Sequence, residues 1–250
     1  MTQYTEDEKT LLRVRRCFGR GVKAYHLIED GDKILIGLSG GKDSLALVEL
    51  LGRRAKQFKP QFSVVAVHVV IENIPYQSDT DYLRDYCEQY DVPFIRYVTR
   101  FEMGADFRKS PCFLCSWNRR KALFTVAKEQ GCNKVALAHH MDDILETLLM
   151  NMCLQGSFSS MPPKMVMDKF DMTLIRPFCL VHESDLELMA TIRGFKKQDK
   201  NCPYETQSDR HKMKDILQQM LEINPHIRYN LWNSMTNIQK EYLPKIFLKR

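Results

Sequence analysis

Six consecutive residues in the first fifth of the chain could bind phosphate. They are Ser39, Gly40, Gly41, Lys42, Asp43 and Ser44. The apolar run Lys33–Leu38 precedes them and a stretch with helical spacing follows, so we expect a loop between a strand and a helix. At such a junction, backbone N–H groups and the positive end of the helix dipole attract an anion. The two glycines let the backbone curl around phosphate oxygens, and both serine hydroxyls can donate hydrogen bonds to them.

This loop differs from two common nucleotide-binding loops. Five positions before Gly41 the chain has Ile36 where a Walker A loop has glycine, and Lys42 is followed by Asp43 instead of serine or threonine. The loop does not match the pattern GxGxxG either. A glycine-rich turn by itself is often only a turn, so the phosphate-binding interpretation depends on all six residues together.

A second polar group follows the apolar run Lys134–Ala138 and opens another helical stretch. It contains His139, His140, Asp142 and Asp143. The carboxyl ends of parallel strands meet at one edge of a sheet, so these side chains should lie at the same edge as the loop. Asp142 could cap its helix. A second carboxylate beside phosphates needs a cation, so we predict that Asp143, with Asp43 as its partner, binds Mg²⁺.

The cysteines suggest a third kind of chemistry. Cys112 and Cys115 form a CxxC motif that opens a helix and is typical of a redox pair, a zinc site or an iron–sulfur site. A redox pair would leave a third cysteine, Cys202 in a polar segment, without a purpose. Zinc completed by a histidine such as His211 stays an alternative. The remaining cysteines are expected to be small buried hydrophobes: Cys17, Cys87, Cys132, Cys153 and Cys179.

Apolar runs and helical patterns alternate along residues 33–154. Strands are expected at Lys33–Leu38, Ser63–Val70, Phe94–Val98 and Lys134–Ala138, and helices at Asp43–Lys56, Asp79–Tyr90, Ser116–Gln130 and Asp142–Leu154. This alternation is typical of βαβ crossovers, and nearly continuous apolar strands are expected when helices cover both sheet faces. We therefore predict an α/β fold with a doubly wound parallel sheet.

The flanking regions read differently from this core. Thr10–Glu29 predicts a basic amphipathic helix, and 157–172 reads as irregular before a last strand at Thr173–Arg176. Three helices follow, at Glu183–Phe195, Asp209–Ile223 and His226–Tyr242. We therefore predict an N-terminal helical arm over residues 1–30, a nucleotide-binding domain over 31–178 and a helical segment over 179–250 that carries Cys202.

The composition excludes several classes of protein. The chain has 250 residues, of which 44% are hydrophobic, enough to fill a core, so disorder is not expected. The polar start and the most apolar run, Val64–Ile71 with His68 inside it, predict neither a signal peptide nor a membrane span. Eight cysteines are too few for a disulfide scaffold, so a reducing cytoplasm is expected.

Charge permits, without requiring, a polyanionic partner. There are 37 Lys and Arg residues against 31 Asp and Glu, a net charge of +6. Basic residues cluster at Arg13–Lys23, Arg119–Lys121, Lys196–Lys200 and Arg210–Lys214, where a phosphate backbone would be attracted. Solvated helix faces have the same composition, so a single cluster does not identify a nucleic-acid surface.

The six loop residues resemble the SGGxDS signature of the PP-loop ATP pyrophosphatase superfamily. The resemblance implies that the enzyme cleaves ATP between its α and β phosphates, adenylates a carbonyl oxygen and releases pyrophosphate. It also implies that His139 belongs to a second ATP motif, in which Ala138 stands where the family more often has glycine. His68, at the end of the second strand, lies where members bind adenine largely through main-chain groups.

The cysteine region is similar to the TtcA family of tRNA 2-thiocytidine synthases. The similarity includes the CxxC motif, Arg119 and Arg120 after it, the later Cys202, and the segments Met161–Lys164 and Ile175–Phe178. It extends from about Arg13 to about Pro244. It implies that Cys112, Cys115 and Cys202 hold a [4Fe-4S] cluster and leave one iron without a protein ligand, where hydrosulfide can bind. Arg119 is then expected to stabilise charge on ATP or the adenylate.

The expected function is therefore an ATP-dependent tRNA thiolase that replaces the C2 oxygen of cytidine 32, in the anticodon loop, by sulfur. Its partners would be tRNA and a sulfur donor, either a cysteine desulfurase or a sulfide source. The alternatives are uridine 2-thiolation, lysidine synthesis, and a zinc-stapled RNA-binding protein without turnover. A homodimer is one option that the sequence leaves open.

Overall fold

The fold is described from a computed structural model of the chain. The structure describes residues 4–72, 78–100, 111–168, 170–198 and 209–244. Contacts divide the chain into two compact units. Unit 1 comprises Met1–Met141 and Pro162–Thr206, and unit 2 comprises Asp142–Met161 and Gln207–Arg250. None of the described helices is long and apolar enough to cross a membrane.

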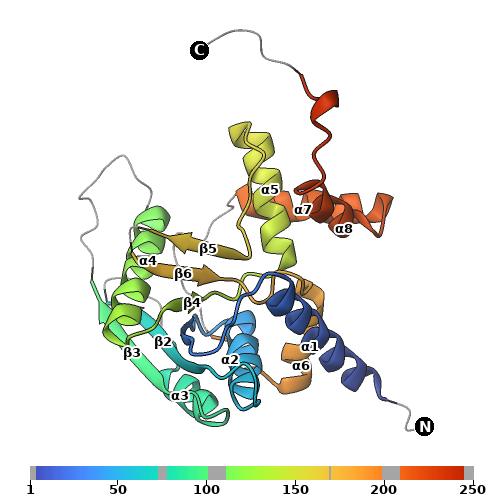
Figure 1. The fold of residues 1–250 in the computed structure, drawn as a ribbon. Helices are drawn as coiled ribbons and strands as arrows, with labels where there is room; N and C mark the ends of the chain where they lie inside the picture. The colour runs from blue at the N-terminus through green and yellow to red at the C-terminus, as the bar shows by residue number, and fades with distance from the viewer. Residues whose placement is uncertain (1–3, 73–77, 101–110, 169, 199–208, 245–250) are drawn as a thin grey trace. The chain divides into compact units, whose positions relative to one another are not determined.

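Unit 1 is built on a six-stranded sheet with the order β3-β2-β1-β4-β6-β5 (Figure 1). The strands are β1 Lys33–Gly37, β2 Ser63–Ile71, β3 Phe94–Thr99, β4 Lys134–Ala136, β5 Lys164–Met167 and β6 Met172–Ile175. Strands β1, β2, β3, β4 and β6 run parallel to one another, and among the described strands of this sheet only the edge strand β5 is antiparallel, in its pairing with β6. The predicted α/β fold with a mostly parallel sheet is confirmed.

Helices cover both faces of this sheet, because residues along β1 alternate between two cores. Ile34 and Ile36 belong to one core, with side chains from α1 (Glu6–Ala24), α2 (Lys42–Ala55), α3 (Thr80–Glu88) and α6 (Glu183–Arg193). Leu35 belongs to the other, which α4 (Pro111–Glu129) covers. Strands buried on both faces are apolar throughout, which is why the central strands could be read from the sequence.

Unit 2 is helical in the described part of the chain. It contains α5 (Met141–Gln155) from its second residue on, α7 (Asp209–Ile223), α8 (Ile227–Ser234) and a short 3₁₀ turn, Lys240–Tyr242. The structure contradicts the prediction of one helix over His226–Tyr242, because α8 ends at Ser234. The division into functional domains that the sequence suggests stays a prediction.

Strand β5 is a second departure from the sequence prediction, which had residues 157–172 as irregular. Its side chains are half-buried or exposed, and its short apolar stretch is flanked in the sequence by two prolines and by polar residues. Backbone pairing with β6 at the edge of the sheet stabilises it. The first helix also ends before the predicted Glu29, at Ala24, because the chain turns at His26 with φ 47°.

Candidate functional site

The phosphate loop lies between the end of β1 and the start of α2, as predicted. Gly40 has φ +83°, a left-handed conformation that only glycine adopts without strain, and Gly41 caps α2. The loop is held by a chain of hydrogen bonds. The Gly41 N–H donates to Ser39 Oγ at 3.3 Å, Ser39 Oγ donates to Ser44 Oγ at 3.1 Å, and Ser44 Oγ donates to the Gly41 carbonyl at 2.8 Å. The loop conformation is therefore built from its own residues.

Asp43 lies in the first turn of α2 with an unsatisfied carboxylate oxygen. Lys42 Nζ is 3.2 Å from Asp43 Oδ1 and 3.6 Å from Glu183 Oε1. The Lys42 contact does not have hydrogen-bond geometry at Oδ1, so this buried oxygen has no hydrogen bond within the described residues. A buried carboxylate oxygen that makes an ion pair but no hydrogen bond can still ligate a metal cation. Sequence reasoning missed Glu183, which carries no motif signal and is brought here by α6.

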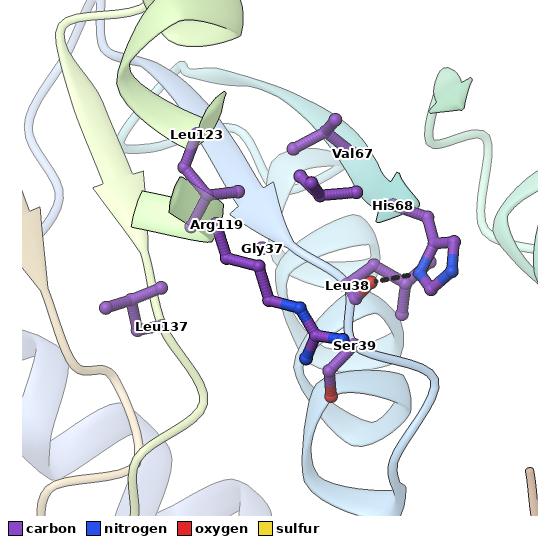
Figure 2. A pocket seen from close by; sticks show the side chains of 9 residues that line it. Gly37, Leu38, Ser39, Val67, His68, Arg119, Leu123 and Leu137 are labelled. Atoms are coloured by element: carbon purple, nitrogen blue, oxygen red, sulfur yellow. Dashed lines mark hydrogen bonds between the residues drawn. The ribbon is translucent and has the colours of Figure 1, made fainter. Parts of the chain in front are cut away.

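A cavity of about 140 Å³ adjoins the loop (Figure 2). Its lining is mostly apolar and comes from the end of β1 and the residues after it, from the middle of β2, from α4 and from the residue after β4: Gly37, Leu38, Ser39, Val67, His68, Val69, Arg119, Leu123 and Leu137. A narrow apolar cavity beside a phosphate loop is suited to a flat aromatic base. The predicted neighbourhood of Ser39, His68 and Arg119 is thus present in unit 1.

His68 is buried in the wall of this cavity, and the residue is 2% exposed. Its Nδ1 lies 2.7 Å from the Leu38 carbonyl oxygen and donates a hydrogen bond to it in the Nδ1–H tautomer. Burial lowers the pKa of His68, and the Arg119 and Arg96 charges act in the same direction against the raising effect of the Leu38 hydrogen bond. The imidazole is therefore neutral at pH 7. It joins the residue after β1 to the middle of β2, which is a structural task; His68 does not end the second strand as predicted, because β2 continues to Ile71.

Arg119 extends from α4 toward Ser39, as Figure 2 shows. It follows Cys115 by four residues, so both side chains project from the same face of α4. Cys115 is half-buried and packs against the core that α4 covers. The guanidinium thus lies beside the phosphate loop and comes from the helix turn that follows Cys115.

Gln198 contacts the phosphate loop, although it lies far from the loop in the sequence, in the second segment of unit 1. No motif in the sequence predicts this contact. It is 6% exposed, and a Cβ added to Gly40 would meet its Cγ at 3.0 Å. Its Oε1 accepts a hydrogen bond from the Asp79 N–H at 2.8 Å, at the start of α3. Lys196 Nζ adds a contact of 2.5 Å to Asp79 Oδ2. Gln198 is therefore anchored beside Gly40.

The residues of the predicted second ATP motif are divided between the two units. Ala138 and His139 are half-buried and belong to unit 1, whereas Asp142 and Asp143 open unit 2. Asp142 is the second residue of α5 and accepts a hydrogen bond from Arg228 Nε at 2.5 Å, so it forms an ion pair within unit 2. Asp43 and Asp143 belong to different units, and their shared binding of Mg²⁺ stays a prediction.

Two of the three predicted cluster ligands cannot be located. The side chain of Cys112 and the whole of Cys202 lie outside the described part of the structure. Among the described residues, no three Cys, His, Asp or Glu side chains form a group that could hold a metal. Of the other cysteines, Cys87, Cys132 and Cys179 are buried as expected.

The remaining two cysteines differ from the expectation of burial. Cys17 is half-buried on α1, and Cys153 is exposed near the end of α5, so the prediction is wrong for Cys153. A helical pattern alone does not decide which face of a terminal turn is covered, because that depends on the neighbouring elements.

Comparison with known proteins gives consistent matches along the chain. A model of the PP-loop domain family matches residues 13–219. The tRNA-cytidine(32) 2-sulfurtransferase of Syntrophotalea carbinolica is 34% identical over 252 residues, which cover 97% of this chain and 95% of that protein. The protein of the same name from Geobacter sulfurreducens is 32% identical, with 95% and 94% covered.

A solved structure matches the fold as well. It is the U34-tRNA thiolase NcsA from Methanococcus maripaludis with its [4Fe-4S] cluster. The match has a TM-score of 0.74 and 26% sequence identity, and it covers 92% of this chain and 78% of that one.

Proposed function

This chain belongs to the PP-loop domain family, and we propose that it is an ATP-dependent tRNA sulfurtransferase that converts cytidine 32 to 2-thiocytidine. The proposal rests mainly on sequence similarity to tRNA-cytidine(32) 2-sulfurtransferases along nearly the whole chain. The arrangement of the site supports it, because the SGGKDS loop, the base-sized cavity and Arg119 lie together. ATP binds through the PP-loop.

The reaction has two steps in this proposal. The cytidine C2 oxygen attacks the α-phosphorus of ATP, and the bond to pyrophosphate breaks. Sulfur then attacks C2, the C2–O bond breaks, and AMP leaves. The cytidine lies in a single-stranded loop, from which a base can be splayed into a pocket.

The phosphate loop binds and orients the triphosphate. Backbone N–H groups at the start of α2 and the hydroxyls of Ser39 and Ser44 supply donors, and Lys42 supplies a charge. The apolar lining of the cavity accepts adenine beside His68. Because His68 is neutral and hydrogen-bonded to Leu38, it shapes this wall and adds no charge to it.

Asp43 is the residue that we assign to Mg²⁺ with most direct support. Its buried Oδ1 has no hydrogen bond in the described part of the chain, which fits a cation ligand. Asp143 is assigned as its partner on the sequence pattern. The ion, when bound, neutralises charge on the phosphates that pyrophosphate carries away.

Arg119 is assigned to the charge that develops at the α-phosphate. Its guanidinium is held by α4 above the loop rather than by a flexible segment. A preorganised donor of this kind stabilises a transition state without reorganising, and losing one typically costs about 10²–10³ in kcat.

Cys112, Cys115 and Cys202 are assigned as ligands of a [4Fe-4S] cluster. Three thiolates can hold such a cluster and leave one iron open to carry sulfur, which zinc closed by four protein ligands could not do. Cys115 shares a helix face with Arg119.

The decisive experiment is mass spectrometry of nucleosides in tRNA from cells with and without the gene. We expect 2-thiocytidine only when the gene is present, and complementation with Asp43→Asn should lower it by about 10²-fold or more. Asp85→Asn is the matched control, because Asp85 is an exposed carboxylate on α3 away from the loop.

Each alternative gives a different result. Loss of 2-thiouridine or lysidine, with 2-thiocytidine unchanged, would assign another base. A binding protein without catalytic activity would be indicated by two results together. The modified nucleosides of tRNA would be the same with and without the gene, and the Asp43→Asn protein would bind tRNA as tightly as the wild type. Anaerobic purification tests the cluster separately, since a colourless protein with zinc and no iron would refute it.

A further inference from the structure

A second cavity lies at the end of α2 that is remote from the phosphate loop. Its volume is about 420 Å³, and it is lined by α1, by the last turn of α2 and by the chain that follows each of α2 and α3. Four of its lining residues are cationic: Arg15, Arg53, Arg54 and Lys56. None of the described residues that line it is acidic. We call this cavity the basic hollow.

Two of the four cations already have partners. Arg53 Nε donates a hydrogen bond to Glu49 Oε1 at 3.0 Å, and its guanidinium lies over the Tyr90 ring at 5.3 Å from the centroid. Lys56 forms an ion pair with Asp91. The contacts with Tyr90 and Asp91 hold the wall of the hollow in place, because they join α2 or its end to the chain after α3, whereas the Arg53–Glu49 bond lies within α2.

The other two cations, Arg15 and Arg54, have no hydrogen-bond or ion-pair partner within the residues that the structure describes. Arg15 is exposed on α1, and Arg54 is half-buried with its Nε fully buried. Burial also lowers the pKa of Arg54. A guanidinium held partly out of water without a counter-charge gains from an anion, and its fork of donors matches phosphate oxygens.

A structural explanation covers only part of this cluster. Cations in the last turn complement the negative end of a helix dipole, which accounts for Arg53 and Arg54 on α2. It does not account for Arg15, which reaches the same cavity from a different helix. On the same helix, Arg13 is paired with Asp185 at 2.7 Å, so the basic stretch of α1 is divided between a structural pair and the hollow.

We propose that the basic hollow binds a phosphodiester group of the tRNA backbone, away from the reacting nucleotide. This proposal rests on the proposed tRNA substrate. Helix α2 has 14 residues, so about 20 Å separates the hollow from the phosphate loop. ATP bound at the loop does not extend that far, whereas the body of a tRNA does. The hollow then contributes affinity and orientation, and takes no part in the chemistry.

The test is the salt dependence of tRNA binding, measured by fluorescence anisotropy with purified protein and unmodified tRNA in the absence of ATP. Arg15→Gln combined with Arg54→Gln should weaken binding about tenfold and reduce the slope of log K against log salt by about 2. Arg16→Gln is the matched control, because Arg16 is exposed, adjacent on α1 and outside the hollow. It should change neither quantity appreciably.

Further readouts keep the two proposals separate. The double variant should keep its melting temperature, its KM for ATP and its kcat at saturating tRNA. A double variant that binds tRNA like Arg16→Gln would overturn the inference even if the wild type thiolates tRNA. Stabilisation of the wild type by millimolar inorganic phosphate in thermal unfolding, lost in the double variant while tRNA affinity is unchanged, would assign a small anion instead. Binding through the hollow without any thiolation would refute the proposed function alone.

Discussion

Replacing Gly40 by alanine tests the loop conformation directly. Gly40 has φ +83°, where an L-residue costs about 1–2 kcal/mol. The added Cβ would also lie 3.0 Å from Gln198 Cγ and 3.7 Å from Leu83 Cδ1, so Gln198 must give way by a few tenths of an ångström. The backbone can relieve both costs only by rotating, which moves the N–H groups that we assign to phosphate. We expect ATP affinity to fall about tenfold, the equivalent of about 1.4 kcal/mol.

Gly31→Ala is a matched control in the same chain. Gly31 also has φ +83°, but in the described structure no atom lies within 4 Å of the added Cβ, and its turn is at the opposite end of β1. The variant therefore carries the conformational cost alone. The conformational cost is about 1–2 kcal/mol, and each kcal/mol lowers the melting temperature by about 2–4 °C. We therefore expect the melting temperature to fall by about 2–8 °C and the ATP affinity to stay unchanged.

Isothermal titration with ATP and thermal unfolding of each variant separate the two effects. Gly40→Ala combined with Gln198→Ala should recover part of the lost affinity, because the shorter side chain removes the contact at Gln198 Cγ. The reasoning is refuted if Gly40→Ala loses as much stability as Gly31→Ala yet binds ATP as tightly as the wild type. It is also refuted if both variants lose ATP affinity equally.

Three further outcomes are expected. Burial lowers the pKa of His68, so below about pH 6.5 the unfolded chain binds a proton that the folded chain does not. The free energy of unfolding is therefore highest above that pH and falls as the pH is lowered. In His68→Gln, the free energy of unfolding measured with urea should depend less on pH between about pH 5 and 7. Glu49 is fully buried and bonded to Arg53 and Arg193, so Glu49→Gln should cost about 3 kcal/mol in the same assay; a loss under about 1 kcal/mol would contradict this. Arg119→Lys should lower kcat for thiolation about 10²-fold at an unchanged melting temperature, and normal turnover would remove Arg119 from the site.

Much of the site follows from residues that are neighbours in the sequence. The SGGKDS loop contains its own glycine at positive φ and its own hydrogen bonds between Ser39, Gly41 and Ser44, so a local pattern suffices to predict it. The central strands are equally readable, because burial on both faces makes each of them nearly continuous in apolar residues. The resemblance to tRNA thiolases is likewise a property of short motifs.

Other features depend on which elements pack together, and periodicity does not encode that. Gln198 and Asp79 are 119 positions apart and meet only because α6 and α3 lie over the same face of the sheet as α2. Strand β5 forms through pairing with β6, although its own side chains carry no strand pattern. The basic hollow joins Arg15 to Arg54 from separate helices. The hydrophobic pattern of a segment indicates which of its side chains are buried. It does not indicate which residues contact each other across the fold, because those contacts depend on how whole helices and strands pack in the folded chain.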